Sequence, residues 1–322
     1  MNNLNKIPIH DSSLRHSIGQ ALYIDDLPEQ ENLLHGAAVL SKFPCGKIKN
    51  INSDKLKNLP FFTKVITAKD IPGANDIGPI KSGEPVLADE FFSYLGQPVA
   101  IVLAKTHQEA VHASSLVEIE TDLTTKPILN LDDAYKKKSF LEKPMILQKG
   151  NIEKDMLKSK YRLSGNFEIG GQDHFYLETH VALTIPGEND EYQVWSSTQH
   201  PTEVQHGVGN ILNIPSAKID SKVRRLGGGF GGKESQATIF AAMSALGAFI
   251  TQKPVKIRLN RRTDMTATGK RHNFKVFFTV GFTATGKLLA LDIKLLSNGG
   301  NVLDLSGPVM TRALTHLDNC YF

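Results

Sequence analysis

The stretch Arg225-Leu226-Gly227-Gly228-Gly229-Phe230-Gly231-Gly232-Lys233-Glu234 decides how this chain is interpreted. Glycines surround a single phenylalanine, so the backbone can adopt positive φ angles and approach a ligand closely. The apolar segment 235–252 that follows predicts a buried helix. Because the first amides of a helix point out of its N-terminus, we expect the loop to face an anion or a metal-oxo group.

Two nucleotide-binding patterns fit part of this loop. Gly227, Gly229 and Gly232 satisfy GxGxxG, and residues 260–262 (Asn-Arg-Arg) could be taken for an NADP 2′-phosphate site. The preceding strand 217–226 argues against a dinucleotide fold, because it is charged and alternating where a buried parallel strand should be continuously apolar.

The second nucleotide pattern is a phosphate loop, because Gly227 and Gly232-Lys233 also fit GxxxxGK. In that pattern Glu234 occupies the position where a serine or threonine should bind magnesium. A third interpretation, a structural glycine turn without a ligand, would be preferred for an isolated cluster.

The segments around the loop predict an α+β protein. Residues 33–41, 63–73, 97–104 and 117–123 read as strands, and 106–116 as a helix capped by Thr106. Residues 131–155 are polar and lysine-rich, as expected of a linker. Beyond them we expect strands at 161–186, 191–199, 217–226, 255–260, 272–283 and 288–300, and helices at 200–214 and 235–252.

Composition excludes several classes of protein. The net charge of +4 comes from scattered lysines, which favours a solvated surface and no nucleic-acid partner. Cys45 and Cys320 belong to no CxxC pattern, so neither a disulfide framework nor a zinc or iron-sulfur site is expected. Without an apolar run of about 20 residues or a signal peptide, we expect a cytoplasmic protein with no membrane partner.

The glycine loop occurs with other motifs in a characteristic order. These are Gly170-Gly171-Gln172-Asp173-His174-Phe175-Tyr176-Leu177-Glu178-Thr179, Ser197-Thr198-Gln199, Gly269-Lys270-Arg271-His272, Arg312-Ala313-Leu314 and Asp318-Asn319-Cys320-Tyr321. Their order and spacing resemble those of the xanthine dehydrogenase and aldehyde oxidase family, over essentially the whole chain.

The resemblance also implies a domain organisation. Gly19-x-Ala21-x-Tyr23-x-Asp25-Asp26 and Gly96-Gln97-Pro98-Val99-Ala100 resemble motifs of the family's hammerhead α/β domain. We therefore expect a hammerhead domain at 1–130, a linker at 131–155 and the first part of a molybdopterin-binding α+β domain at 156–322.

By this resemblance, a molybdenum-molybdopterin cofactor is expected at the glycine loop. Gln199 would stand in the molybdenum shell, and Phe230 and Gly231 would bring a backbone amide to an oxo group of the metal. Position alone would make Gln199 a strand-end residue that bonds its own turn, and Phe230 the apolar plug of a turn.

Glu234 and Arg312 look like the family's substrate-binding pair. A carboxylate and a guanidinium can bond the edges of a purine and stabilise the negative charge that develops on it. Aldehyde oxidases typically lack this pair, so the resemblance favours xanthine or hypoxanthine. Position alone would make Glu234 a helix-dipole partner and Arg312 a surface ion pair. The histidines at 174, 180, 200 and 206 lack metal-ligand spacing and are expected to be structural or surface groups.

The implied reaction is hydroxylation of a ring carbon with water-derived oxygen. Electrons would pass to 2Fe-2S clusters and FAD on a separate small subunit, which predicts a hetero-oligomer. The family's general-base glutamate and later pterin contacts lie beyond residue 322, so we expect no catalytic residue and no activity in this chain alone. The alternatives are a molybdenum hydroxylase for another heterocycle or an aldehyde, and an inactive remnant that serves as an assembly module.

Overall fold

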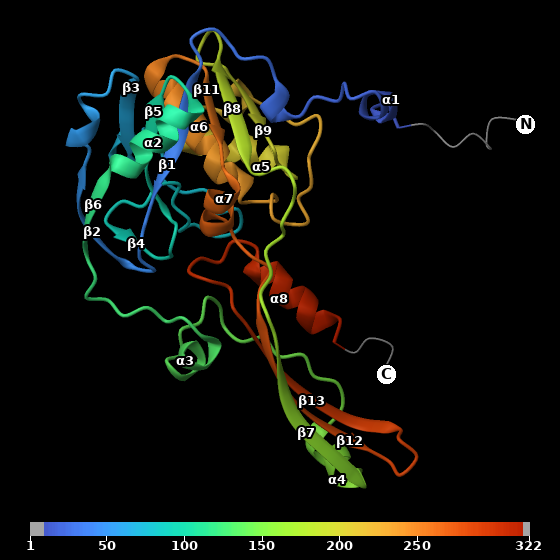
Figure 1. The fold of residues 1–322 in the computed structure, drawn as a ribbon. Coiled ribbons are helices and arrows are strands. Elements are labelled where there is room, and N and C mark those ends of the chain that lie inside the picture. Colours follow the sequence, from blue (N-terminus) through green and yellow to red (C-terminus); the bar gives the residue numbers. More distant parts are fainter. Residues whose placement is uncertain (1–9, 318–322) are drawn as a thin grey trace, which may run out of the picture.

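The computed structural model describes residues 10–317, in which a seven-stranded mixed sheet forms the centre (Figure 1). Its order is β10-β9-β8-β11-β1-β5-β3. The bounds are β1 Leu34–Leu40, β3 Phe62–Thr67, β5 Pro98–Ala104, β8 Val181–Pro186, β9 Tyr192–Ser196, β10 Ile219–Lys222 and β11 Val255–Arg258. Because β1 pairs in parallel with β11, strands on both sides of the expected linker share this sheet.

β5 is buried on both faces of the sheet, which explains its continuously apolar sequence. Ile101 and Leu103 pack into the larger core, while Ala100 and Val102 pack into a second core on the opposite face. Helix α2 (His107–Leu116) contributes to that second core and begins, as predicted, at a Thr106 cap whose Oγ1 accepts the Glu109 amide at 3.3 Å.

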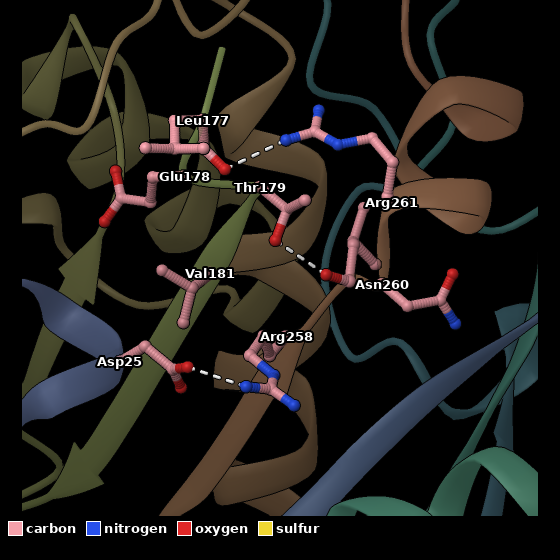
Figure 2. Close-up of a pocket in the computed structure, with 9 residues that line it drawn as sticks. Asp25, Leu177, Glu178, Thr179, Val181, Arg258, Asn260 and Arg261 are labelled. Carbon is pink, nitrogen blue, oxygen red and sulfur yellow. Dashed lines mark hydrogen bonds and ion pairs between the residues drawn. The ribbon is translucent and has the colours of Figure 1, made fainter. Parts of the chain in front are cut away.

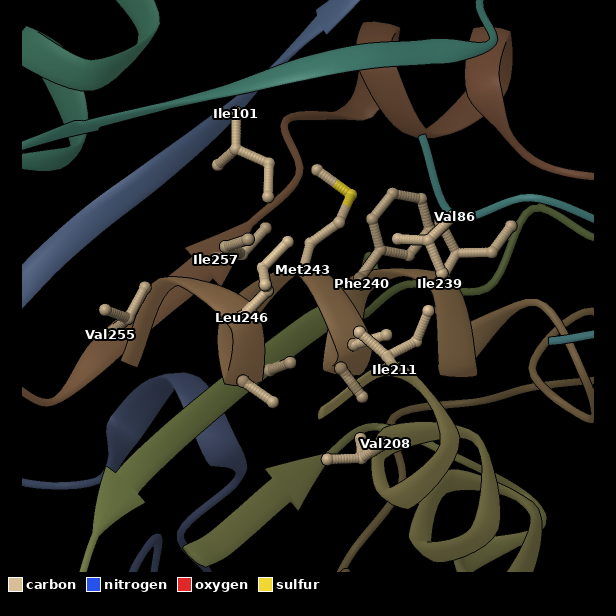
Figure 3. Packing of buried hydrophobic residues seen from close by; sticks show 14 of the residues in the cluster. Val86, Ile101, Val208, Ile211, Ile239, Phe240, Met243, Leu246, Val255 and Ile257 are labelled. Carbon is tan, nitrogen blue, oxygen red and sulfur yellow. The ribbon is translucent and has the colours of Figure 1, made fainter. Parts of the chain in front are cut away.

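The larger core is centred on α6 (Ala237–Thr251), whose predicted burial is confirmed. Figure 3 shows Phe240, Met243 and Leu246 of α6 beside Ile101 and Ile257 of the sheet. Burial of one such side chain contributes about 1.5–3 kcal/mol. Helix α5 (Pro201–Leu212) packs against α6 and starts at Pro201, as predicted.

A second sheet, β13-β12-β7, extends away from this centre (Figure 1). Its strands are β7 Tyr161–Ile169, β12 Phe274–Phe282 and β13 Leu288–Ser297. The prediction of one strand over 161–186 is wrong, because the chain leaves β7 at Gly170-Gly171 and enters the main sheet only at Val181. This second sheet leaves large apolar side chains exposed, among them Leu163, Phe167 and Leu291.

The remaining elements are short. They are strands β2 Gly46–Asn52, β4 Phe91–Phe92 and β6 Glu118–Asp122, and helices α1 Ser13–Ser17, α3 Leu131–Lys136, α4 Ile152–Lys158, α7 Arg261–Ala267 and α8 Ser306–Thr315. Four 3-10 turns complete the set over residues 10–317, η1 Ile24–Asp26, η2 Asp54–Leu56, η3 Ala68–Asp70 and η4 Ser216–Lys218. The expected linker 131–155 therefore contains α3 and the start of α4. Among residues 10–317, no helix combines the length and apolar character needed to cross a bilayer.

Candidate functional site

The glycine loop, residues 227–233, lies between β10 and α6, at one end of the strands of the main sheet. β8 is antiparallel to both β9 and β11, so its first residues lie beside their last ones, as the pair Val181 and Arg258 shows. Three segments therefore gather at this end of the strands: those that follow β9 and β11, and the segment 172–180 that precedes β8. This arrangement brings Gln199 and the motif at 170–179 to the loop.

Gln199 is bound directly to the glycine loop. Its backbone amide donates to the Lys233 carbonyl at 2.8 Å. Its Oε1 accepts the Gly231 amide at 2.9 Å and the Lys233 amide at 3.3 Å. Two donors on Oε1 orient the side chain, so Nε2 points elsewhere and has no hydrogen-bond partner among residues 10–317. Gln199 thus bonds the loop instead of its own turn, with its donor end available.

The loop is packed on one side and open at its tip. A Cβ built on Gly227 would lie 2.4 Å from the Glu178 Cβ, and one on Gly229 would lie 2.4 Å from the Gln199 Oε1. In contrast, a Cβ on Gly231 would meet nothing within 4 Å. Phe230 sits at the tip with φ +55° and leaves 75% of its surface exposed, so it is not the buried plug of a turn.

These donors fit the oxo group of a metal cofactor. The Phe230 amide has no hydrogen-bond partner within the described part of the chain, and neither has the Gln199 Nε2. Both are neutral N–H donors next to an open tip, held by a backbone that cannot easily reorganise. Such fixed donors suit an oxygen that carries partial negative charge.

Lys233 is buried beneath the loop and cannot reach a phosphate. Its side chain is 0% exposed, and Nζ donates to the Glu178 carbonyl at 2.7 Å and to the Glu178 Oε2 at 3.1 Å. The same Oε2 accepts the Gly227 amide at 2.8 Å. Glu178 thus ties the first and last residues of the loop together. Burial lowers the pKa of Lys233, partly opposed by Glu178. The phosphate-loop interpretation fails because its lysine is already paired.

A buried polar network supports the segment under the loop. The Asp264 carboxylate, on α7, accepts the Tyr176 hydroxyl at 2.7 Å and the His180 amide at 2.7 Å, and lies 3.0 Å from the His180 Nδ1. Burial alone would raise the pKa of Asp264, but the hydrogen bonds and charge of His180 hold it below its ordinary value. Burial also lowers the pKa of His180. The network fixes residues 176–180, and through Glu178 it fixes the loop.

The dinucleotide interpretation does not fit the sheet. β10 is a short strand at the edge of the sheet, and the irregular residues 223–236 separate it from α6. In a dinucleotide fold the glycine turn joins a buried strand directly to its helix. The predicted strand 217–226 is confirmed only over Ile219–Lys222.

A pocket of about 330 Å³ is lined in part by Glu178, the residue that bonds Gly227 of the loop (Figure 2). Its charged residues are already engaged. Arg258 pairs with Asp25 at 2.8 Å, and Arg261 donates to the Leu177 carbonyl at 2.9 Å. The Arg261 Nη2 is therefore engaged, while its Nη1 has no partner among residues 10–317, and the pocket contains neither Gln199 nor Phe230.

The expected substrate residues are exposed. Glu234 directly follows the glycine loop, whereas Arg312 lies on α8. Within residues 10–317 neither side chain forms an ion pair, and no hydrogen bond or ion pair joins Arg312 to Gln199 or to the loop. The structure thus brings Gln199, Phe230, Gly231 and Glu234 together and leaves Arg312 on a separate helix.

Sequence reasoning missed the groups that hold the loop from below. Glu178, Lys233 and Asp264 are distant in sequence, and Lys233 was read only as a phosphate ligand. The one available signal was that Glu178 belongs to the conspicuous motif 170–179, which His180 directly follows. His174 stacks on Tyr176, His180 is buried, and His200 and His206 are exposed. The motif 318–321, with Cys320, lies outside the described residues.

Comparison with known families assigns both halves of the chain. Residues 18–123 match the aldehyde oxidase and xanthine dehydrogenase a/b hammerhead domain, and residues 135–322 match the molybdopterin cofactor-binding domain. Among solved structures, the CO dehydrogenase of Oligotropha carboxidovorans has a TM-score of 0.78 at 22% identity, over 89% of this chain and 39% of that one. Quinoline 2-oxidoreductase of Pseudomonas putida 86 also has a TM-score of 0.78, at 21% identity over 89% of this chain and 38% of that one. These two likenesses show the fold alone.

Curated relatives are more similar in sequence. The chain is 39% identical to a xanthine dehydrogenase/oxidase of Gallus gallus and 40% identical to a xanthine dehydrogenase of Oryza sativa subsp. japonica. Each match covers 97% of this chain and 23% of the relative, so the chain spans about a quarter of the length of these proteins. Because one of the two family matches alone covers more than half of the residues, the chain belongs to the aldehyde oxidase and xanthine dehydrogenase family and carries its molybdopterin cofactor-binding domain.

Proposed function

We propose that this chain is the cofactor-holding part of a xanthine dehydrogenase-type molybdenum hydroxylase that acts on xanthine or hypoxanthine. The observation that carries the proposal is the joining of Gln199 to the glycine loop. The contact presents two unpartnered donors, the Gln199 Nε2 and the Phe230 amide, at an open tip. A turn with no ligand would not require both the buried ion pair of Glu178 and Lys233 beneath the loop and unpartnered donors at its tip.

When bound, the molybdenum-pterin group would supply two-electron redox chemistry and a water-derived oxygen. The chain's own residues would orient it. The Gln199 Nε2 and the Phe230 amide would donate hydrogen bonds to its oxygen ligands, and Gly231 would leave room for its approach. Because the Glu178 and Lys233 clamp fixes the loop beforehand, these donors need no reorganisation when negative charge develops.

Glu234 and Arg312 would select the substrate. Glu234 would accept an N–H of the purine ring, and Arg312 would donate to a ring carbonyl and stabilise its developing negative charge. Both side chains are exposed and free of ion pairs within the described residues, so they can bind a ligand without first breaking an internal contact. This pair is what favours a purine over an aldehyde.

We propose a separate iron-sulfur and FAD subunit as the electron acceptor, in a hetero-oligomer. A 2Fe-2S cluster needs four ligands, usually cysteines, so these 322 residues, with two cysteines, do not hold such a cluster themselves. We also propose the domain division 1–130, 131–155 and 156–322. The polar course of residues 131–155, with the short helix α3 and the start of α4, supports this division along the chain, while β1 and β11 join the two parts in one sheet.

The test uses the full-length subunit co-expressed with its partner. Molybdenum content and xanthine-dependent dye reduction are measured for the parent and for Glu234→Gln, Arg312→Met and the exposed control Glu90→Gln. We expect the two site variants to retain molybdenum and lose at least tenfold in kcat/KM for xanthine, with Glu90→Gln unchanged.

Three other results would each point elsewhere. Turnover of aldehydes or other heterocycles, with no turnover of xanthine, would show that the enzyme acts on a different substrate class. A protein without molybdenum or any turnover would support the assembly module. Dye reduction with NADP in a molybdenum-free protein would restore the dinucleotide interpretation.

A further inference from the structure

A buried and a half-buried carboxyl group meet at one amide, where three distant segments of the chain come together. Glu84 belongs to the loop before β4, Gln236 directly precedes α6, and Asp304 lies in the turn before α8. The Gln236 Nε2 lies 3.3 Å from the Glu84 Oε1 and 3.3 Å from the Asp304 Oδ2. The Gln236 Oε1 accepts the Gly269 amide at 3.1 Å, which leaves its NH₂ group for the two carboxyls.

The carboxyl groups are too poorly solvated for both to be ionised at little cost. Glu84 exposes 8% of its surface. The Glu84 Oε2 and the Asp304 Oδ1 are buried without a hydrogen-bond partner among residues 10–317. Within the same residues neither carboxyl has a lysine or arginine in ion-pair distance. Two like charges sharing a site raise the pKa of at least one of the groups.

The surrounding groups add negative charge and no compensating cation. Asp76 accepts the Glu84 amide at 3.2 Å, and the half-buried Tyr94 lies nearby. On the other side, the His272 Nε2 lies 2.7 Å from the Ser306 Oγ, and burial lowers the pKa of His272, so it is neutral near pH 7. Burial, followed by the charge of Asp304, raises the pKa of Glu84 to about 7, and burial also raises that of Asp304.

We propose that Glu84 and Asp304 hold one proton between them near neutral pH and thereby seat the α8 segment against the start of α6. The inference rests on the proposed function for its purpose, because Glu234 lies two residues before Gln236 and Arg312 lies on the helix that follows Asp304. Glu84 and Asp304 are thus positioning residues for the substrate pair. When the shared proton leaves for solvent, the two carboxylates repel each other and favour release of α8.

The direct test is hydrogen–deuterium exchange of α8 on this chain at about pH 6 and pH 8, corrected for the intrinsic exchange rate. For a group titrating near pH 7, we expect the opening equilibrium of α8 to rise about tenfold between these values. Glu84→Gln and Asp304→Asn imitate the protonated state and should abolish the rise. Glu90→Gln, an exposed glutamate after the same loop, should behave like the parent.

An α8 whose protection is equal at both pH values in the parent, or a rise that persists in Glu84→Gln, would overturn the proposal. If Glu84→Gln does not fold, Asp304→Asn gives the same comparison.

In the full-length protein, the pH dependence of KM for xanthine should be flattened by Glu84→Gln, while the plateau of kcat is kept. If α8 exchange depends on pH but xanthine is not turned over, the proposal for Glu84 and Asp304 is supported and the proposed substrate is wrong.

Discussion

Replacement of the buried Lys233 by methionine should be among the most destabilising single changes in this chain. Lys233→Met keeps the length of the side chain and removes the charge. It leaves the Glu178 carboxylate with only the Gly227 amide, since its Oε1 already lacks a partner among the described residues. Breaking a buried ion pair on one side costs about 3–5 kcal/mol, because the remaining charge is uncompensated.

The matched control is Lys158→Met on α4. Lys158 pairs with Asp155 at 2.8 Å, a distance similar to that of the buried pair, but its side chain is 59% exposed. Exposed pairs contribute about 0–1 kcal/mol. The two substitutions therefore differ mainly in burial.

Urea unfolding provides the assay, followed by the fluorescence of Trp195, the only tryptophan in the sequence. The double variant Glu178→Gln/Lys233→Met removes both charges of this ion pair and should recover more than half of the loss. Equal losses for Lys233→Met and Lys158→Met would refute the buried clamp, and so would a double variant no more stable than Lys233→Met.

Three further predictions concern the supporting network, the proton-sharing pair and the loop. Asp264→Asn should cost about 2–4 kcal/mol in urea unfolding at pH 7, because the His180 amide and the Tyr176 hydroxyl lose a charged acceptor. The pKa of Asp264 is lowered, so its contribution is present above its unfolded value and is lost as pH falls; the variant should show a shallower loss of stability in acid. For Glu84 the sign is opposite: with a pKa raised from 4.5 to about 7, the parent should lose about 3 kcal/mol of unfolding free energy between those pH values, and a Glu84→Gln curve that falls equally would contradict this. Gly229→Ala would place a Cβ 2.4 Å from the Gln199 Oε1 and should lower the molybdenum content of the full-length protein, whereas Gly170→Ala, with nothing within 4 Å, should retain it.

Much of the fold could be predicted because local sequence and burial agree. The apolar run of β5 and the apolar segment of α6 indicate elements buried on all sides, and Thr106 and Pro201 mark true helix starts. The parallel pairing of β1 with β11 could not be predicted, because it joins segments far apart in sequence whose edges carry no distinguishing side chains.

Prediction of the site from the sequence was limited for a similar reason. A glycine-rich loop with a lysine suits several ligands, and only the neighbours decide among them. Lys233 is excluded from phosphate binding by Glu178, and Gln199 is oriented by the amides of Gly231 and Lys233. These contacts follow from the antiparallel course of β8, which no local pattern reveals.

The backbone of two exposed aromatic residues gives a separate reason to place a ligand at this face. Phe230 and Phe175 have φ values of +55° and +49°, in the left-handed region that costs an ordinary residue about 1–2 kcal/mol. Contacts offset only part of this cost: Arg261 lies 5.1 Å from the centroid of the Phe175 ring, but Phe230 and Phe175 leave 75% and 65% of their surfaces exposed. Strained residues persist where the surroundings hold them, and they concentrate at functional sites. Here Glu178 and Gln199 hold the loop, and Tyr176 packs against it beside Phe175. We therefore propose that this strained surface is prepared in advance for a partner, which would have room to bind at the open tip at Gly231.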